Sequence, residues 1–240
     1  VAYRAAGNGV ELLALTDHDD IAGLPAARDA AEESGMAFVS GVEISIEWEG
    51  TQIHVVGLNF DAGNAALNEG LAAIRAGRID RARRMAAELE RHGIANTFEG
   101  AMRYAENPNL ISRAHFARYL VETKRCKDVR SVFETYLVPG KPGYVDHRWA
   151  DLGDAVSWIL GAGGVAVVAH PARYKVSMGA MRRFLGEFRD LGGQAIEVVS
   201  GSHSLDDVGT YGRLAREFGF LASRGSDFHG PQESYVDLGM

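Results

Sequence analysis

Four apolar segments of this 240-residue chain end in side chains of the types that bind metal ions. They are residues 12–19 (LLALTDHD), 39–45 (VSGVEIS), 165–171 (VAVVAHP) and 221–229 (LASRGSDFH). A short run of Val, Leu, Ile and Ala predicts a buried parallel strand, and each polar group stands where that strand would end. In a closed barrel of parallel strands these ends meet on one face. We therefore expect imidazoles and carboxylates from distant parts of the sequence to form one site, suited to Zn, Mn or Fe.

The candidate ligands differ in how strongly their surroundings favour metal binding. His18 belongs to a dense charged group after an apolar run, which costs solvation free energy unless a metal or hydrogen bonds compensate for it. Asp227 and His229 are separated by one residue, so in an extended segment both would point to the same side. Glu43, as a carboxylate, could bridge two ions. The predicted metal ligands are His18, Glu43, His54, His170, Asp227 and His229.

Several other polar side chains could contact a substrate. His203 lies in a loop of small hydroxyl residues (SGSHS), where metal binding and substrate binding are equally favoured. Ser112, Arg113 and His115 stand together at a predicted helix and could grip phosphate, because Arg presents fixed donors to phosphate oxygens. An ordinary exposed helix face is the alternative. The predicted substrate-binding residues are Ser112, Arg113, His115, Lys141, Arg173 and His203, and catalytic roles are assigned to His18, Asp227 and His203.

The elements that must position these side chains alternate along the chain. Strand-like runs fall at residues 12–16, 37–42, 53–58, 165–169, 195–199 and 220–222. Helical patterns fall at residues 22–34, 151–162, 177–191 and 204–218. This alternation predicts an α/β fold. Residues 64–138 break it, because they contain helical patterns and almost no strand. We expect a barrel formed by residues 1–63 and 139–240, with 64–138 as a helical insertion that caps the substrate or merely adds bulk.

Composition limits the class of protein. The net charge of −7 and the pI near 5.6 leave no global basic field to hold long nucleic acid, although a small anionic substrate is compatible with them. Cys126 is the only cysteine, which excludes an internal disulfide and a Cys-rich zinc site. No apolar stretch approaches the ~20 residues needed to span a membrane. We expect a cytoplasmic protein, and the start at Val-Ala-Tyr suggests a fragment of a longer one.

The ordered motifs TDHD (16–19), GVE (41–43), His54, AHP (169–171) and SDFH (226–229) resemble those of the PHP (polymerase and histidinol phosphatase) superfamily. Within it, the segments NLISRAHFARYLV (109–121) and YLVPGKPGYV (136–145) resemble the bacterial enzymes that act as nucleoside 3′,5′-bisphosphate phosphatases or as 5′-to-3′ exoribonucleases on short RNA. The resemblance implies a distorted (β/α)7 TIM-like barrel with two or three divalent metal ions at its C-terminal face. Mn is preferred for this site, with Zn, Fe or Mg as alternatives.

The same resemblance implies hydrolysis of the substrate's 3′-phosphate by a metal-bound hydroxide, with phosphate as the product. It also predicts an N-terminal strand bearing His-x-His, followed by Ser-Asp-Gly, and this sequence holds neither. The first motif present is the second of the family, so one strand and three expected ligands are missing, which would leave the fragment itself inactive.

Two other functions remain open from the sequence. A non-catalytic PHP module would explain the missing His-x-His by degeneration, although the remaining ligands argue against scattered loss. A metal-dependent amidohydrolase would also use His and Asp at strand ends, but a carboxylated lysine is common there and no Lys ends a strand in this chain. The oligomeric state is left undetermined.

Overall fold

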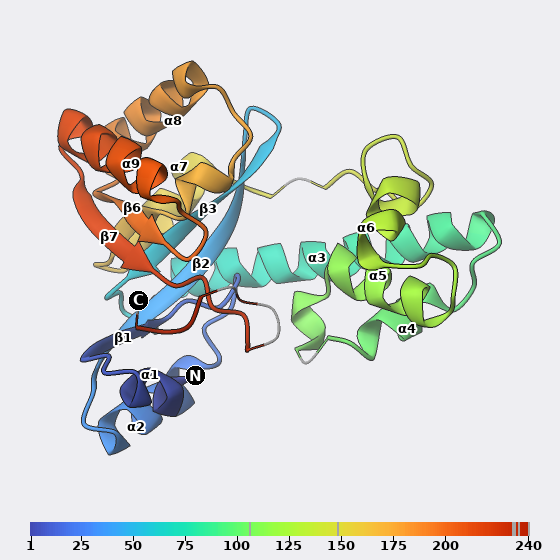
Figure 1. Cartoon of the computed structure of the whole chain (residues 1–240), viewed down its shortest axis with the longest axis horizontal. Coiled ribbons are helices and arrows are strands. Elements are labelled where there is room, and N and C mark those ends of the chain that lie inside the picture. The colour runs from blue at the N-terminus through green and yellow to red at the C-terminus, as the bar shows by residue number, and fades with distance from the viewer. Residues whose placement is uncertain (106, 148, 232–233, 235, 240) are drawn as a thin grey trace. The chain divides into compact units, whose positions relative to one another are not determined.

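The computed structural model describes the whole chain except residues 106, 148, 232–233, 235 and 240, and it divides into two compact units. Unit 1 comprises Val1–Leu71 and Ala150–Met240, and unit 2 comprises Ala72–Trp149. The long helix α3 (Ala65–Arg91) contributes to both (Figure 1). The substrate-capping role expected for residues 64–138 stays a prediction.

Unit 1 is built on a curled sheet whose strands follow the order β1-β2-β3-β5-β6-β7, with β4 beside β2 (Figure 1). The bounds are β1 Leu12–Leu15, β2 Ala37–Trp48, β3 Thr51–Leu58, β4 Ala150–Asp151, β5 Val165–Val168, β6 Ala195–Ser200 and β7 Leu221–Gly225. All neighbours pair in parallel except β3, which is antiparallel to both β2 and β5. The predicted α/β fold is confirmed, and among the described strands β1 and β7 form the two outer edges.

The expectation that every strand is parallel is wrong for β3, and a tight turn explains why. Glu49 and Gly50 both have positive φ, 44° and 73°, and they join Trp48 to its partner Thr51. Positive φ at both central residues is the geometry that matches the twist of an antiparallel hairpin. The chain therefore turns straight back after β2 and does not pass through a crossover helix.

The helices of unit 1 form where the periodic patterns predict them. Their bounds are α1 Ala2–Gly7, α2 Leu24–Glu33, α7 Leu152–Gly161, α8 Met178–Asp190 and α9 Leu205–Phe218. Helix α7 packs on β5, α9 packs on β6 and β7, and α2 packs on β2. The core between sheet and helices includes Ile44, Val55 and Phe184, all fully buried. Only α1 had no counterpart among the predicted helices.

Unit 2 is built mainly from helices. Besides the C-terminal part of α3 it contains α4 Thr97–Met102, the 3₁₀ turn η1 Pro108–Leu110, α5 Arg113–Glu122, α6 Val129–Val132 and the π-helical η2 Phe133–Leu137. Met85 and Leu89 of α3 pack with Phe116 and Leu120 of α5 in its core. Gly93, at φ 80°, ends the long helix, because glycine adopts this conformation without steric cost.

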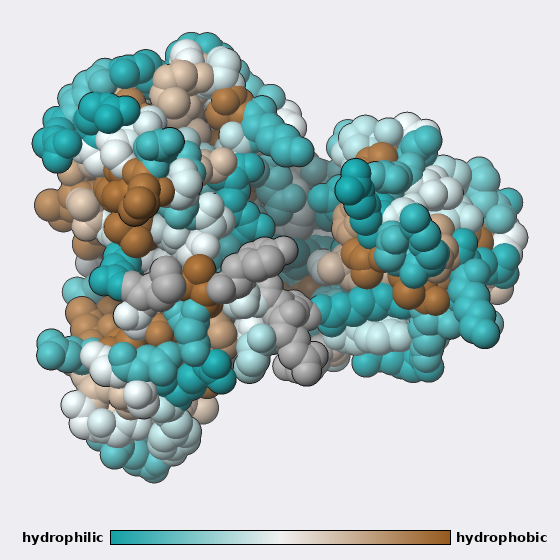
Figure 2. All heavy atoms as spheres, viewed as in Figure 1, coloured by the Kyte–Doolittle hydropathy of each residue, from teal (hydrophilic) through white to brown (hydrophobic). Residues whose placement is uncertain are grey.

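The visible surface is mostly polar, with apolar residues in small patches (Figure 2). In unit 1 the exposed apolar side chains include Leu12 of β1 and Leu221 of β7, which lie on the two outer strands. Among the described residues, no helix is both long enough and apolar enough to cross a membrane.

Candidate metal centre

His18 reaches the site because the chain stays paired with β2 after β1 ends. The Glu43 N–H donates to the carbonyl of Asp17, and the Asp19 N–H donates to the carbonyl of Glu43, at 3.0 and 2.8 Å. This bridge sets His18 directly beside Glu43. Gly41 permits the close approach, since a Cβ there would lie 2.4 Å from the carbonyl oxygen of Leu15.

Glu43 and His54 lie within strands, and the expectation that Glu43 marks a strand end is wrong. Strand β2 continues to Trp48, and His54 stands inside β3 opposite Ser45. Glu43 pairs with Val56, so His54 is its diagonal neighbour on the same face of the hairpin. The two side chains meet there, with 2.7 Å between Glu43 Oε1 and His54 Nδ1.

His170 lies two residues after the end of β5 and has a strained backbone conformation. Its φ of 25° is costly for a residue with a Cβ, and such strain persists only where the surroundings fix it. Here the His170 N–H donates to the Glu197 carboxylate at 2.6 Å, and His170 Nε2 lies 2.8 Å from Glu43 Oε1. His54 Nδ1 and His170 Nε2 are 3.3 Å apart, so both imidazoles point at one carboxylate oxygen.

Asp227 and His229 follow β7, but not in the extended segment that the sequence suggested. Strand β7 ends at Gly225, and Asp227 has a φ of 52°, so alternation along a strand does not orient these side chains. Asp227 forms an ion pair with Arg173. His229 Nδ1 lies 3.0 Å from the carbonyl of Asp227, and its ring lies 5.8 Å from that of His18.

Five of the six predicted ligands gather in two groups that share one carboxylate. His18, Glu43 and His54 form one group, and Glu43, His170 and Asp227 form the other, with ligand atoms within 4.8 Å of one another in each. His229 is adjacent but belongs to neither. A shared carboxylate between two sets of imidazole and carboxylate donors suits a pair of divalent ions. The donor set therefore fits divalent metal ions.

The electrostatics of Glu43 favour the charged form that a metal needs. Burial raises the pKa of this carboxyl group, but the nearby imidazoles of His18 and His54 and the hydrogen bonds with His170 and His54 outweigh it. The net result is a pKa well below the usual range. Burial lowers the pKa of His170, whereas its hydrogen bond with Glu43 raises it, and the pKa is raised overall. Protons and metal ions thus compete for these imidazoles.

Three supporting residues escaped the sequence analysis. Glu197 of β6 is 9% exposed, and burial raises its pKa to about 7. The Tyr174 hydroxyl donates to the Ala169 carbonyl at 3.0 Å and accepts from the His54 N–H at 2.8 Å. The amide of Gln52 lies 3.3 Å from Nε2 of His54 and can serve either tautomer of that ring. For Glu197, the signal available in the sequence was a lone Glu inside the apolar run AIEVVS.

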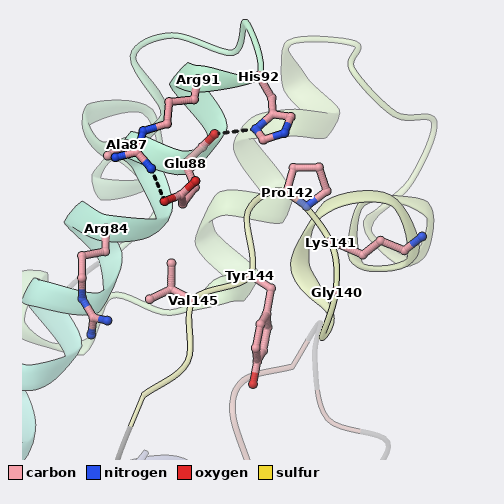
Figure 3. A pocket seen from close by; sticks show the side chains of 10 residues that line it. All are labelled: Arg84, Ala87, Glu88, Arg91, His92, Gly140, Lys141, Pro142, Tyr144 and Val145. Atoms are coloured by element: carbon pink, nitrogen blue, oxygen red, sulfur yellow. Dashed lines mark hydrogen bonds and ion pairs between the residues drawn. The ribbon is translucent and has the colours of Figure 1, made fainter.

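The predicted substrate-binding residues make different kinds of local contact. His203 uses both ring nitrogens within the protein, because Nδ1 donates to the Val198 carbonyl at 3.0 Å and Nε2 accepts from the Ala172 N–H at 3.4 Å. In unit 2, Ser112 and His115 close a capping box at the start of α5. Arg113 contacts the Leu137 carbonyl, and Lys141 lines a groove beside α3 (Figure 3).

Comparison with known proteins identifies the family of this chain, although no protein-family model matches it. The 3′,5′-nucleoside bisphosphate phosphatase of Chromobacterium violaceum is 53% identical over 239 residues, which cover 100% of this chain and 84% of that protein. The 5′-3′ exoribonuclease Rnm of Escherichia coli is 39% identical over 241 residues, which cover 100% of this chain and 82% of that protein.

Two solved structures share the fold. A structure described as an amidohydrolase from Chromobacterium violaceum, with bound sulfate and no metal, is 53% identical, with a TM-score of 0.91 over 99% of this chain and 83% of that one. A structure described as a metal-dependent phosphoesterase from Bifidobacterium adolescentis is 25% identical, with a TM-score of 0.85 over 99% of this chain and 84% of that one. The chain therefore belongs to the PHP superfamily of metal-dependent phosphoesterases, in the group of hydrolases that contains the bisphosphate phosphatase and the exoribonuclease.

Proposed function

We propose that this protein hydrolyses the 3′-phosphate of nucleoside 3′,5′-bisphosphates and also acts on short 5′-phosphorylated RNA. The observation that carries the proposal is the pair of ligand groups that share Glu43. The similarity to a bisphosphate phosphatase and to exoribonucleases supports the choice of substrate. Both substrates present a phosphate ester, so one hydrolytic site serves both.

Divalent ions, when bound, activate water and neutralise charge on phosphoryl oxygens. The protein's part is to fix the ligands. His18 and His54 offer nitrogens to one ligand group, His170 offers a nitrogen and Asp227 a carboxylate oxygen to the other, and Glu43 belongs to both. We assign His18 and Asp227 their catalytic roles as such ligands, with Mn preferred over Zn, Fe or Mg. Arg173 holds the Asp227 carboxylate in place.

His203 has a positioning role in this proposal. Its neutral tautomer is set by the Val198 carbonyl, and its free nitrogen accepts from the Ala172 N–H. That contact fixes the turn after His170. Replacing His203 should therefore alter the geometry of His170. It would not remove a group that donates a proton to the substrate.

The test combines metal analysis with phosphate release from adenosine 3′,5′-bisphosphate, using protein expressed from its complete reading frame. We expect release only with a divalent metal, loss of activity in chelator, and recovery when Mn is restored. Undiminished activity in chelator would exclude the metal mechanism. Tight metal binding without any turnover would favour a non-catalytic module.

A further inference from the structure

The hydrogen bonds between β3 and β5 pass through a tyrosine side chain at the end where the two strands separate. The register pairs Val55 with Val168, so His54 and Ala169 are the next pair. The Ala169 N–H donates to the His54 carbonyl at 3.2 Å. In an antiparallel pair of this type the two residues exchange both backbone hydrogen bonds, so the His54 N–H would donate directly to the Ala169 carbonyl.

The hydroxyl of Tyr174 occupies the place of that second bond. It accepts from the His54 N–H at 2.8 Å and donates to the Ala169 carbonyl at 3.0 Å. Burial raises the pKa of this hydroxyl well above its usual value, so it keeps the proton that it donates. Two hydrogen bonds in series span a greater distance than the about 2.9 Å of one direct N–H···O bond. The pair is therefore closed on one side and held open on the other.

The opened side belongs to the peptide group between Ala169 and His170, whose two polar atoms are both held by side chains. Its carbonyl accepts from Tyr174, and its N–H donates to the Glu197 carboxylate at 2.6 Å. A peptide group is planar, so contacts at its two opposite edges fix its orientation. The torsion that follows this plane is the φ of His170, at 25°. Tyr174 and Glu197 thus hold the strained backbone from two sides.

A short 3₁₀ turn brings Tyr174 back to Ala169. This turn, η3, spans Pro171–Arg173, and the Arg173 N–H donates to the His170 carbonyl at 3.0 Å. Tyr174 is the residue after the turn, and its ring centroid lies 5.5 Å from that of His170. Its ring therefore packs beside a predicted metal ligand, while its hydroxyl contacts the backbone on either side of the opened pair.

We propose that Tyr174 is a positioning residue of the metal centre, whose hydroxyl keeps β3 and β5 apart at their last pair and so sets the separation of His54 and His170. Nδ1 of His54 and Nε2 of His170 lie 3.3 Å apart, and they face the same oxygen of Glu43 at 2.7 and 2.8 Å. This inference rests on the proposed function in taking the centre to bind divalent ions.

Loss of the hydroxyl would let the opened pair close. The peptide group before His170 would then move toward β3. Because β3 and β6 lie on opposite sides of β5, the same movement would draw the His170 N–H away from Glu197 on β6. The imidazole of His170 would no longer point at the oxygen that it shares with His54.

Tyr174→Phe tests this role, because it removes the hydroxyl and keeps the ring. Using protein expressed from its complete reading frame, we would titrate the metal-free native protein and variant with Mn²⁺, and record the visible absorption of each with saturating Co²⁺. We expect Tyr174→Phe to bind Mn²⁺ about 10–100-fold more weakly and to show an altered Co²⁺ spectrum even at saturation, since partners that orient metal ligands have effects of this size. Tyr104→Phe is the matched control, because it removes a hydroxyl of unit 2 that donates to Glu122 at 2.8 Å, and it should behave like the native protein.

The outcomes separate this role from an effect on folding and from the proposed function. If Tyr174→Phe is folded, as urea unfolding would show, unchanged Mn²⁺ affinity with an unchanged Co²⁺ spectrum would overturn the proposal. If it does not fold, the native protein decides: the His54 amide proton should show a nuclear Overhauser contact with the Tyr174 ring protons beside the hydroxyl, and lack of that contact would refute the proposal. If the Mn²⁺-loaded native protein releases no phosphate from adenosine 3′,5′-bisphosphate, the proposed function fails, and the metal titrations still decide the role of Tyr174.

Discussion

Replacing Gly225 with alanine should detach Glu197 from His170 and so weaken the metal centre. A Cβ at position 225 would lie 2.2 Å from Glu197 Oε1, closer than real Cβ atoms approach, and 3.1 Å from its carboxyl carbon, which is also tight. The other oxygen of Glu197 accepts the His170 N–H at 2.6 Å. The carboxylate cannot move away from the new methyl group without straining this hydrogen bond.

The expected size follows from two costs. Overfilling a packed interior destabilises by about 1–3 kcal/mol, and a hydrogen bond to a charged group contributes about 1.5–3 kcal/mol. Partial relaxation makes their sum an upper limit, so we expect Gly225→Ala to lower the free energy of unfolding by roughly 3 kcal/mol. Backbone strain does not enter, because Gly225 lacks the positive φ that disfavours alanine.

Gly212→Ala is the matched control. Gly212 lies in α9, and its Cβ would be 3.6 Å from Val198 Cγ1, an ordinary contact. There alanine should raise stability by about 0.5–1 kcal/mol, as it does in helix interiors. Shortening the clashing side chain with Glu197→Asp should recover part of the loss in the Gly225→Ala background.

The assays are urea unfolding and metal titration of each variant. Gly225→Ala should lose both stability and metal affinity, since His170 depends on Glu197 for its strained backbone. If Gly225→Ala unfolds like the native protein and binds metal equally well, the bracing role of Glu197 is wrong. A loss that Glu197→Asp does not relieve would place the clash elsewhere.

Three further results are expected. Asp227→Asn should lower kcat by more than about 100-fold and weaken metal binding, because an amide cannot supply the negative charge of the carboxylate. Metal analysis together with turnover measurements tests this, and normal turnover would refute it. Arg113→Ala should weaken substrate binding by about 1.5–3 kcal/mol in a direct titration, and unchanged affinity would exclude Arg113 from the predicted substrate-binding residues. Burial lowers the pKa of His147 from 6.5 to about 4, so the unfolded state binds more protons in that range and stability should rise with pH across it. His147→Asn should flatten this rise, which unfolding curves at several pH values would detect.

The strand ends were predictable because their signal is local. An apolar run followed by a polar ligand describes His170 after β5 and Asp227 after β7, and both belong to the group around Glu43. His18 was found in the same way. Such a pattern needs no knowledge of what lies across the sheet.

The centre of the site was harder to predict, because its geometry depends on pairing. The predicted strand stopped at Val42, where the continuous apolar run ends, yet β2 goes on with alternating Glu43, Ser45 and Glu47. Alternation with period two indicates a strand with two different faces. The hairpin turn was also missed, because Glu-Gly is a weaker turn signal than Asn-Gly or Asp-Gly.

Glu197 could not have been recognised from its own segment, because its partners come from other strands. Its carboxylate accepts the backbone N–H of His170, after β5, and faces Gly225 of β7. In the sequence it is a single Glu among apolar residues, and solvent or an ion pair would explain it as well as a buried role. The burial that raises its pKa exists only in the folded sheet.

The antiparallel strand β3 is what makes a shared carboxylate possible. If β3 ran parallel to β2, a ligand from it would have to come from its C-terminal end, as with His170. In the hairpin the middle of β3 lies beside the middle of β2, so His54 meets Glu43 on one face of the pair. Strand β5, on the other side of β3, then brings His170 to the same oxygen of Glu43. One reversed strand thus places Glu43 between two sets of donors, which purely parallel strand ends would not have predicted.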